Sequence, residues 1–228
     1  MGKATREAYG NALARIGKEN TNIIVLDADL SKSTKTDTFK NVCPERFFNV
    51  GIAEQNLISV GAGLAAAGKI PFVSSFAMFA TGRAFEQIRN AVCYPKLNVK
   101  VCATHAGITV GEDGATHQSL EDISCMRTLP NMTVVVPADE RETEAVVEWA
   151  ASYKGPVYVR LGRAGVDDVT SEGYTFVPGQ STTLVDGSDV TIIACGALVV
   201  PAVEAAKTLA ESNVFARVIN MASIKPID

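Results

Sequence analysis

The sequence predicts an α/β fold, in which a mostly parallel sheet carries helices on both faces and an incomplete second α/β unit follows. Short apolar runs alternate along the chain with segments whose apolar residues recur at helical spacing. Runs such as 23–26 and 99–103 are continuously apolar and rich in β-branched residues, which is typical of strands buried on both faces. Polar and glycine-rich loops follow several runs, as expected where ligands bind beyond the carboxyl ends of parallel strands.

The elements of the first unit begin with a helix at 5–17, where Gly17 is a plausible stop, and a strand at 23–26 followed by a polar loop through Thr38. The stretch Phe47–Asn56 predicts a short buried strand that ends at Gly51 and turns at once into a helix. The remaining elements are that helix to about residue 68, strands at 71–75, 99–103, 133–136 and 157–161, and helices at 81–93, after an N-cap at Ser119, and at 139–151.

Glu54 lies where the strand of Phe47–Asn56 turns into its helix, so its carboxylate sits beside a helix N-terminus. A glutamate in the first helical turn is favourable by about 0.3–1 kcal/mol through the helix dipole, which alone could explain it. The alternative is that Glu54 performs chemistry at the ligand edge of the sheet. The spacing leaves both interpretations open.

The composition excludes several classes of protein. The 228 residues have a net charge of -4 and no long run of Lys or Arg, which argues against a nucleic-acid surface. No apolar run approaches the length of about 18 residues that spans a membrane, and the N-terminus has no apolar signal core, so we expect a cytoplasmic protein. The five scattered cysteines predict small buried hydrophobes in a reducing compartment: Cys43, Cys93, Cys102, Cys125 and Cys195.

The chain divides into a first domain at 1–163, a linker at 164–188 and the start of a second domain at 189–228. The linker is rich in Gly, Asp, Ser and Thr. Beyond it, a strand at 190–195, a helix at 198–209 and a strand at 215–219 form one β-α-β unit. One such unit buries too little apolar area to stand alone, so we expect it to pack on the first domain or on another chain, or to be truncated.

Both histidines lie in one glycine-rich loop, Thr104–Gln118, which also contains Asp113. A zinc site would need a third ligand at fitting spacing, so His105 and His117 favour proton transfer and hydroxyl recognition. Phe76 and Phe79 end a strand and are either core residues or a cofactor platform. Arg6 and Arg163 are either surface residues or phosphate ligands, and the glycine motifs of dinucleotide and nucleoside triphosphate sites are absent from the sequence.

Three motifs together resemble a known family: Gly51–Asn56 (GIAEQN), Ser75–Phe79 (SFAMF), and Thr104-His105 with Gly111–Gln118 (GEDGATHQ). In this order and at these separations they are similar to the pyrimidine-binding domain of transketolase, a thiamine diphosphate enzyme. The resemblance covers almost the whole chain. It implies the C-terminal subunit of a transketolase that is split into two polypeptides, because nothing in the sequence matches the Gly-Asp-Gly metal motif of the diphosphate-binding domain.

The resemblance implies roles for ten residues. Glu54 would hydrogen-bond the N1′ atom of the cofactor's aminopyrimidine, Phe79 would stack on that ring with Phe76 beside it, and Asp29 would lie near the cofactor. His105 and Asp113 would contact substrate hydroxyls, and His117 would assist proton transfer at the substrate oxygen. Arg6, Ser33 and Arg163 would bind the sugar phosphate. A third aromatic residue found in some members falls near Gly82 here, which implies a more open pyrimidine pocket.

The resemblance also implies a reaction and partners. A glycolaldehyde unit would pass from a ketose phosphate such as xylulose 5-phosphate to an aldose phosphate such as ribose 5-phosphate, in the pentose phosphate pathway. Mg²⁺ or Ca²⁺ would be held by the N-terminal, diphosphate-binding subunit, with which this chain would form a dimer or heterotetramer. This chain alone would be inactive.

Three other functions stay open. The β-subunit of a 2-oxo acid dehydrogenase and deoxyxylulose phosphate synthase share the fold and the glutamate motif, and a pyruvate assay separates them from transketolase. A catalytically idle scaffold subunit would tolerate Glu54→Ala. A nucleotide-binding doubly wound domain is disfavoured by the missing phosphate loop.

Overall fold

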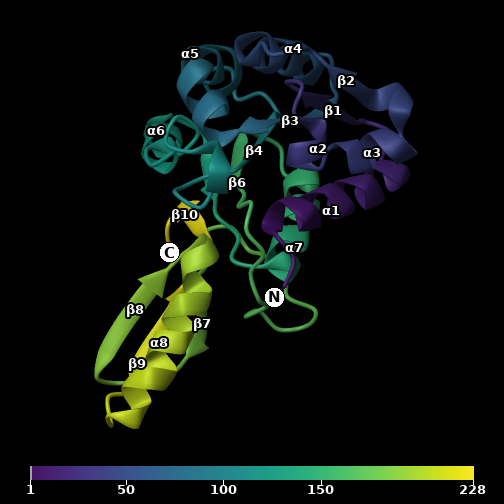
Figure 1. Cartoon of the computed structure of the whole chain (residues 1–228). Helices are drawn as coiled ribbons and strands as arrows, with labels where there is room; N and C mark the ends of the chain where they lie inside the picture. The colour runs from purple at the N-terminus through teal and green to yellow at the C-terminus, as the bar shows by residue number, and fades with distance from the viewer. Residues whose placement is uncertain (1) are drawn as a thin grey trace.

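The computed structural model describes residues 2–228. A seven-stranded sheet forms the centre of the first unit (Figure 1). Its strand order is β10-β5-β6-β4-β3-β1-β2, and all neighbours are parallel except β10, which runs antiparallel to β5. The strands are β1 Ile23–Asp27, β2 Phe47–Asn49, β3 Ile70–Phe76, β4 Lys100–Thr104, β5 Thr133–Val135, β6 Val157–Arg160 and β10 Ser223–Lys225. The predicted mostly parallel sheet is confirmed.

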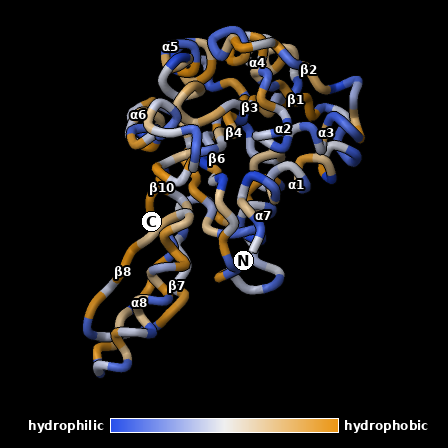
Figure 2. Tube along the Cα trace, viewed as in Figure 1, coloured by the Kyte–Doolittle hydropathy of each residue, from blue (hydrophilic) through white to orange (hydrophobic). Residues whose placement is uncertain are grey.

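Helices cover both faces of this sheet. On one face α1 (Thr5–Glu19), α3 (Asp37–Val42) and α7 (Glu140–Ser152) enclose one hydrophobic core. On the other face α4 (Glu54–Ala66), α5 (Phe85–Gln87) and α6 (Asp122–Thr128) enclose another. Neighbouring strand residues alternate between the two cores, and in Figure 2 hydrophobic residues concentrate along the central strands. The continuous apolar runs therefore arise because each strand is buried on both sides.

The segment after β1 folds into two short helices, α2 (Ser31–Thr34) and α3, where the sequence predicted a polar loop through Thr38. Asp27, at the end of β1, is fully buried, and its carboxylate accepts hydrogen bonds from the Leu30 N–H (2.6 Å) and the Thr34 and Thr36 hydroxyls (2.7 and 2.9 Å). Burial raises the pKa of Asp27 above its ordinary value, against the effect of these bonds. The loop prediction was wrong because one buried carboxylate organises the polar segment.

The strand and helix that the sequence placed in Phe47–Asn56 are both present as β2 and α4, but β2 lies at the edge of the sheet. Phe47 is buried, whereas Phe48 is 47% exposed. The prediction of a buried strand was therefore wrong for all but its first residue. An edge position leaves one side of β2 unpaired, which is available to other parts of an assembly.

Two further helix predictions change in detail. The helix predicted at 81–93 is a succession of the π-helical turn η2 (Phe79–Arg83), α5 and the π-helical turn η3 (Ile88–Cys93). Such turns are frequent at functional sites. Ser119 is not an N-cap, because α6 starts at Asp122 with Glu121 in that position. Ser119 instead forms a β-bridge with Gly107 and closes the base of the histidine-containing loop, which includes the 3-10 turn η4 (Gly111–Asp113).

The second unit is a three-stranded sheet of order β7-β9-β8 with one long helix across it (Figure 1). Its elements are β7 Thr182–Val185, β8 Val190–Ala194, η5 Gly196–Leu198, α8 Val199–Glu211 and β9 Ala216–Asn220. Strand β7 lies inside the predicted linker. The buried core of this unit is small, and Ile193 of β8 is 63% exposed. The second unit therefore buries little apolar surface within itself.

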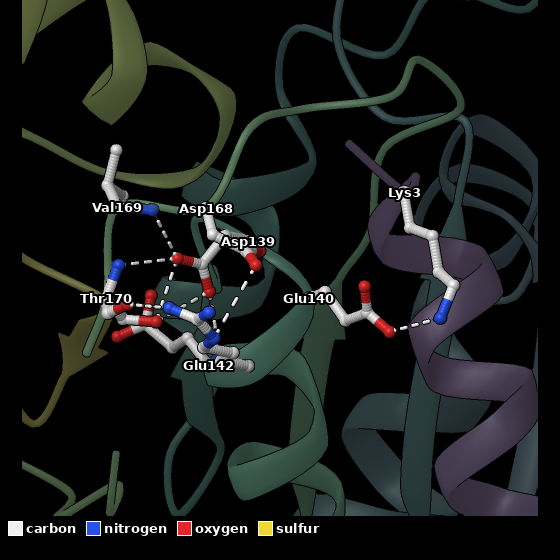
Figure 3. Close-up of polar contacts among 8 residues, drawn as sticks. Lys3, Asp139, Glu140, Glu142, Asp168, Val169 and Thr170 are labelled. Carbon is white, nitrogen blue, oxygen red and sulfur yellow. Dashed lines mark hydrogen bonds and ion pairs between the residues drawn. The ribbon is translucent and has the colours of Figure 1, made fainter. Parts of the chain in front are cut away.

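Polar contacts at the N-terminus of α7 hold the connecting segment (Figure 3). Asp139 caps this helix at the Glu142 N–H (2.8 Å) and accepts hydrogen bonds from the N–H groups of Val169 (2.8 Å) and Thr170 (2.7 Å). The buried Glu142 carboxylate accepts from the Asn220 side chain of β9 at 2.9 Å. These contacts, with β10 in the first sheet, attach the second unit to the first.

Candidate active site

The predicted site residues gather at the carboxyl edge of the parallel sheet. Asp29 follows β1, Glu54 follows β2, Phe76 and Phe79 end or follow β3, and the loop of both histidines follows β4. Arg163 comes shortly after β6, and Arg6 is the second residue of α1. Parallel strands present their carboxyl ends at one edge, so residues far apart in sequence meet there.

Glu54 is the first residue of α4 and is only 1% exposed. The left-handed turn at Gly51 (φ 75°) redirects the chain from β2 into this helix, where the dipole favours an anion. Its carboxylate accepts a hydrogen bond from Arg83 Nη1 at 2.8 Å and a longer one from the Ser75 hydroxyl at 3.4 Å. Glu54 is therefore a buried, ion-paired carboxylate.

Aromatic rings from three segments form one cluster beside Glu54. The rings of Phe76 and Phe79 lie 5.9 Å apart at an interplanar angle of 15°. His105 stacks on Phe76 with a centroid distance of 3.8 Å, and His117 meets Phe79 edge-on at 5.0 Å. The cluster brings both histidines and both phenylalanines of the sequence prediction into mutual contact.

His105 is held in one tautomer by its neighbours. Arg6 Nη1 lies 3.3 Å from His105 Nε2, and because a guanidinium only donates, Nε2 must accept. The proton is therefore on Nδ1, which donates to the Thr104 hydroxyl at 2.9 Å. Burial, followed by the charge of Arg6, lowers the pKa of His105 to about 4, so the ring is neutral near pH 7. Its backbone is left-handed (φ 58°), a strained conformation that often occurs at functional sites.

Arg6 and Arg163 are brought together by pairing between the N-terminal residues and the segment after β6. Ala4 forms a β-bridge with Gly165, and the Gly162 N–H donates to the Thr5 hydroxyl at 2.8 Å. Arg6 also donates to the Ser33 carbonyl at 2.9 Å, while its buried Nε has no hydrogen-bond partner within residues 2–228. Arg163 binds the Val110 carbonyl and Glu112. Two cations with one unpaired N–H make an environment suited to an anion.

The remaining predicted residues lie around this centre. Asp113 is exposed in η4, and its charge acts on both Arg6 and His105. Asp29 is exposed, left-handed (φ 65°), and bonded to Asn49. Ser33 faces the site through its carbonyl group, which binds Arg6.

Two residues of the site were missed by the sequence analysis. Arg83 pairs with Glu54 and lies over the Phe79 ring, with 4.5 Å from its guanidinium carbon to the centroid. Its position four residues after Phe79 in a helical segment was the available signal. Asn49 bonds Asp29 and also accepts from the Gly51 N–H at 2.9 Å. Nothing in a strand-ending asparagine distinguishes this role.

One cavity lies where the two units meet, and its lining includes Ala106, the residue after His105. Its volume is about 380 Å³, and it is lined by apolar residues of both units together with Arg160 and Cys195. None of the ten predicted residues lines it. We place the chemistry at the aromatic cluster, because the buried carboxylate and the histidines are there.

Residues 2–228 contain no group of three or more His, Cys, Asp or Glu residues placed to hold a metal ion. They also contain no helix with the length and hydrophobicity required to cross a membrane.

Comparisons with known families agree with the fold and with the order of the motifs. Residues 1–167 match the model of the transketolase pyrimidine-binding domain, and residues 179–228 match the transketolase C-terminal domain. A Methanocaldococcus jannaschii protein whose name carries the words "transketolase C-terminal section" is 55% identical over 99% of this chain and 72% of its own length. Human transketolase is 39% identical over 99% of this chain, which spans 36% of the human enzyme.

Solved structures give the same result. A structure described as "Split gene transketolase, inactive beta4 tetramer" is 60% identical, with a TM-score of 0.92 over 100% of this chain and 74% of its own. Transketolase from Leishmania mexicana is 30% identical, with a TM-score of 0.88 over 97% of this chain and 34% of its own. Family models, relatives and solved structures thus agree, and the chain belongs to the transketolase family of thiamine diphosphate-dependent transferases, whose pyrimidine-binding domain it contains.

Proposed function

We propose that this chain is the pyrimidine-binding subunit of a two-polypeptide transketolase. The observation that carries the proposal is the buried Glu54 carboxylate beside the stacked Phe76 and Phe79 rings, with both histidines on the same cluster. A carboxylate next to an aromatic face is suited to a flat heterocycle that offers a ring nitrogen and an amino group. The Arg83 guanidinium, itself a planar N–H donor, already occupies such a position, so the donor set fits an aminopyrimidine.

Glu54 would hydrogen-bond N1′ of the aminopyrimidine, and Phe79 would stack on the ring with Phe76 behind it and Asp29 nearby. When bound, thiamine diphosphate supplies a carbanion at its thiazolium C2 and an electron sink for the two-carbon unit. Burial keeps the Glu54 carboxylate away from water, which would strengthen its hydrogen bond to the cofactor, and the helix N-terminus stabilises its negative charge.

The histidines and arginines would act on the sugar substrate. His105, which is neutral, and Asp113 would contact substrate hydroxyls, while His117 would assist proton transfer at the substrate oxygen. Arg6 and Arg163, with Ser33 beside Arg6, would bind the phosphate. The unpartnered Nε of Arg6 supports this assignment, because a buried N–H without an acceptor is costly unless a ligand supplies one.

The diphosphate and its Mg²⁺ or Ca²⁺ would be bound by a second polypeptide, the N-terminal subunit. The similar structure described as an inactive β4 tetramer of a split-gene transketolase supports both a separate partner and self-association. Assembly would give a dimer or a heterotetramer, and this chain alone would be inactive.

The reaction would transfer a glycolaldehyde unit from xylulose 5-phosphate to ribose 5-phosphate, a step of the pentose phosphate pathway. Other relatives are named for different sugars. An apulose-4-phosphate transketolase subunit of Phocaeicola vulgatus is 40% identical, and a 6-deoxy-6-sulfo-D-fructose transketolase subunit of a Clostridium species is 41% identical. The donor sugar is therefore the first variable to test.

The test is reconstitution with a diphosphate-binding transketolase subunit, thiamine diphosphate and Mg²⁺. We expect ketol transfer with the two pentose phosphates, no turnover of pyruvate, and no activity of this chain by itself. Glu54→Gln should lower kcat by about 10²–10⁴-fold, the usual contribution of a positioned acid or base. Turnover of pyruvate alone would favour the 2-oxo acid enzymes, and full activity of Glu54→Ala in the complex would favour a scaffold subunit.

A further inference from the structure

Arg83 is the principal partner of the buried Glu54. Its Nη1 donates to Glu54 Oε2 at 2.8 Å, whereas the other carboxylate oxygen has only the longer contact of 3.4 Å with Ser75. The Glu54 side chain is 1% exposed and that of Arg83 is 49% exposed. The pair therefore joins a fixed, buried anion to a cation whose other side is open to water.

The same guanidinium lies on the face of Phe79, 4.5 Å from its centroid. The π-helical turn η2 carries both residues four positions apart. A planar guanidinium suits this position, because it can stack on a ring while it donates in its own plane. Arg83 thus uses two features of the site at once, the carboxylate and the ring face.

An aminopyrimidine bound as proposed above would need the same two features. Its ring nitrogen would pair with Glu54, and its plane would stack on Phe79. Both groups are flat N–H donors of similar thickness, so the two occupancies exclude each other. Since half of the Arg83 side chain is exposed, its guanidinium can leave for water without disturbing a core residue.

We propose that Arg83 is an internal competitor of the cofactor, which holds Glu54 and Phe79 in the free subunit and is displaced when the aminopyrimidine binds. This inference rests on the proposed function. The pair removes the cost of an isolated buried carboxylate before assembly. It also weakens the apparent affinity for the cofactor, because only molecules in which Arg83 lies outside the site can bind it. The apparent Kd is then the intrinsic Kd divided by the fraction of such molecules.

The experiment compares wild type, Arg83→Met and the matched control Arg89→Met, an exposed arginine of η3. The melting temperature of each free subunit is measured first, and then the Kd of thiamine diphosphate for each reconstituted complex by calorimetry with Mg²⁺. Arg83→Met should lower the melting temperature, because Glu54 loses its cation. It should also bind thiamine diphosphate about tenfold more tightly, the factor expected if Arg83 leaves the site in about a tenth of the molecules. Arg89→Met should match wild type in both.

A second variant keeps the test decisive if Arg83→Met does not fold. Arg83→Lys retains a cation for Glu54 but has no planar group to stack on Phe79, so its affinity for thiamine diphosphate should lie between the other two. Equal or weaker binding by the Arg83 variants would overturn the competition while leaving the proposed function intact. A wild-type complex that binds no thiamine diphosphate would instead overturn the proposed function, and the competition with it.

Discussion

Asn49 and Asp29 exchange two hydrogen bonds across the ends of neighbouring strands. The Asp29 N–H donates to Asn49 Oδ1 at 3.0 Å, and Asn49 Nδ2 donates to Asp29 Oδ1 at 2.8 Å. Asn49 Oδ1 also accepts the Gly51 N–H at 2.9 Å. One side chain at the end of β2 therefore fixes both the left-handed turn at Asp29 and the turn that leads into Glu54.

Asn49→Ala should weaken cofactor binding by the reconstituted complex more than it destabilises the fold. The change removes all three hydrogen bonds of the Asn49 side chain. If cofactor binding loses the contribution of one of them, about 0.5–1.5 kcal/mol, the Kd rises roughly twofold to twelvefold. Calorimetric titration of the reconstituted complex with thiamine diphosphate measures this Kd. Asn56→Ala, a change at an exposed asparagine of α4, is the control. An unchanged Kd in Asn49→Ala would show that the two turns keep their positions without this side chain.

His105 should remain neutral, with its proton on Nδ1, well below pH 6. Burial is the main reason that its pKa falls to about 4 from 6.5, and Arg6 is the second. Folding stability linked to His105 is therefore lost as the pH falls from about 6.5 through about 4, where the unfolded chain binds the proton first. Nitrogen NMR shifts of the imidazole report both the charge and the tautomer.

Arg6→Met tests how much the charge of Arg6 lowers the pKa of His105. It should raise the pKa of His105 only part of the way to 6.5, because burial, the larger cause, remains. A His105 ring that titrates near 6.5 in the wild-type protein, or that carries its proton on Nε2, would contradict the contact between Arg6 and His105 Nε2.

Lys100 should give the protein a distinct dependence of stability on pH. It is fully buried at the start of β4 and donates to the carbonyl groups of Tyr153 (2.7 Å) and Gly155 (2.8 Å). Burial lowers its pKa from 10.5 to about 7. Between these values the unfolded chain holds a proton that the folded chain lacks, so the free energy of unfolding rises with pH.

The comparison is urea unfolding of wild type and Lys100→Met between pH 7 and 10. Groups common to both proteins cancel in the difference. We expect the stability of wild type to increase relative to the variant over this interval. Parallel curves would mean that Lys100 keeps its ordinary pKa in the folded protein.

Asn220→Ala should weaken the attachment of the second unit to the first. The variant removes the Asn220 donor to the buried Glu142 carboxylate, which would keep its bonds to the Ala138 N–H at 2.7 Å and to the Tyr174 side chain. A buried acceptor left without one partner costs about 1–3 kcal/mol. Urea unfolding measures this cost, with Lys207→Ala on the exposed side of α8 as the control. Equal losses in both variants would assign the effect to the second unit as a whole.

Much of the fold could be predicted because its signals are local. Continuous apolar runs such as 23–26 mark strands buried on both faces, and every strand except β7 and β10, which were not predicted, lies within a few residues of its predicted position, as do most helices. Predictions failed where a distant partner decides the structure. The buried Asp27 converts a polar segment into α2 and α3, and pairing with Gly107 takes Ser119 away from the start of α6.

The pattern of apolar residues and the order of the motifs can be read from the sequence. They were sufficient to predict the α/β architecture, the transketolase family and the residue types available for chemistry. Only the tertiary structure decided which of those residues meet. Strand register and loop closure bring Arg6 to His105, Asn49 to Asp29 and Arg83 to Glu54. A change of about 1 Å in the distance between donor and acceptor is enough to break such a hydrogen bond or ion pair. Spacing along a chain does not carry that precision.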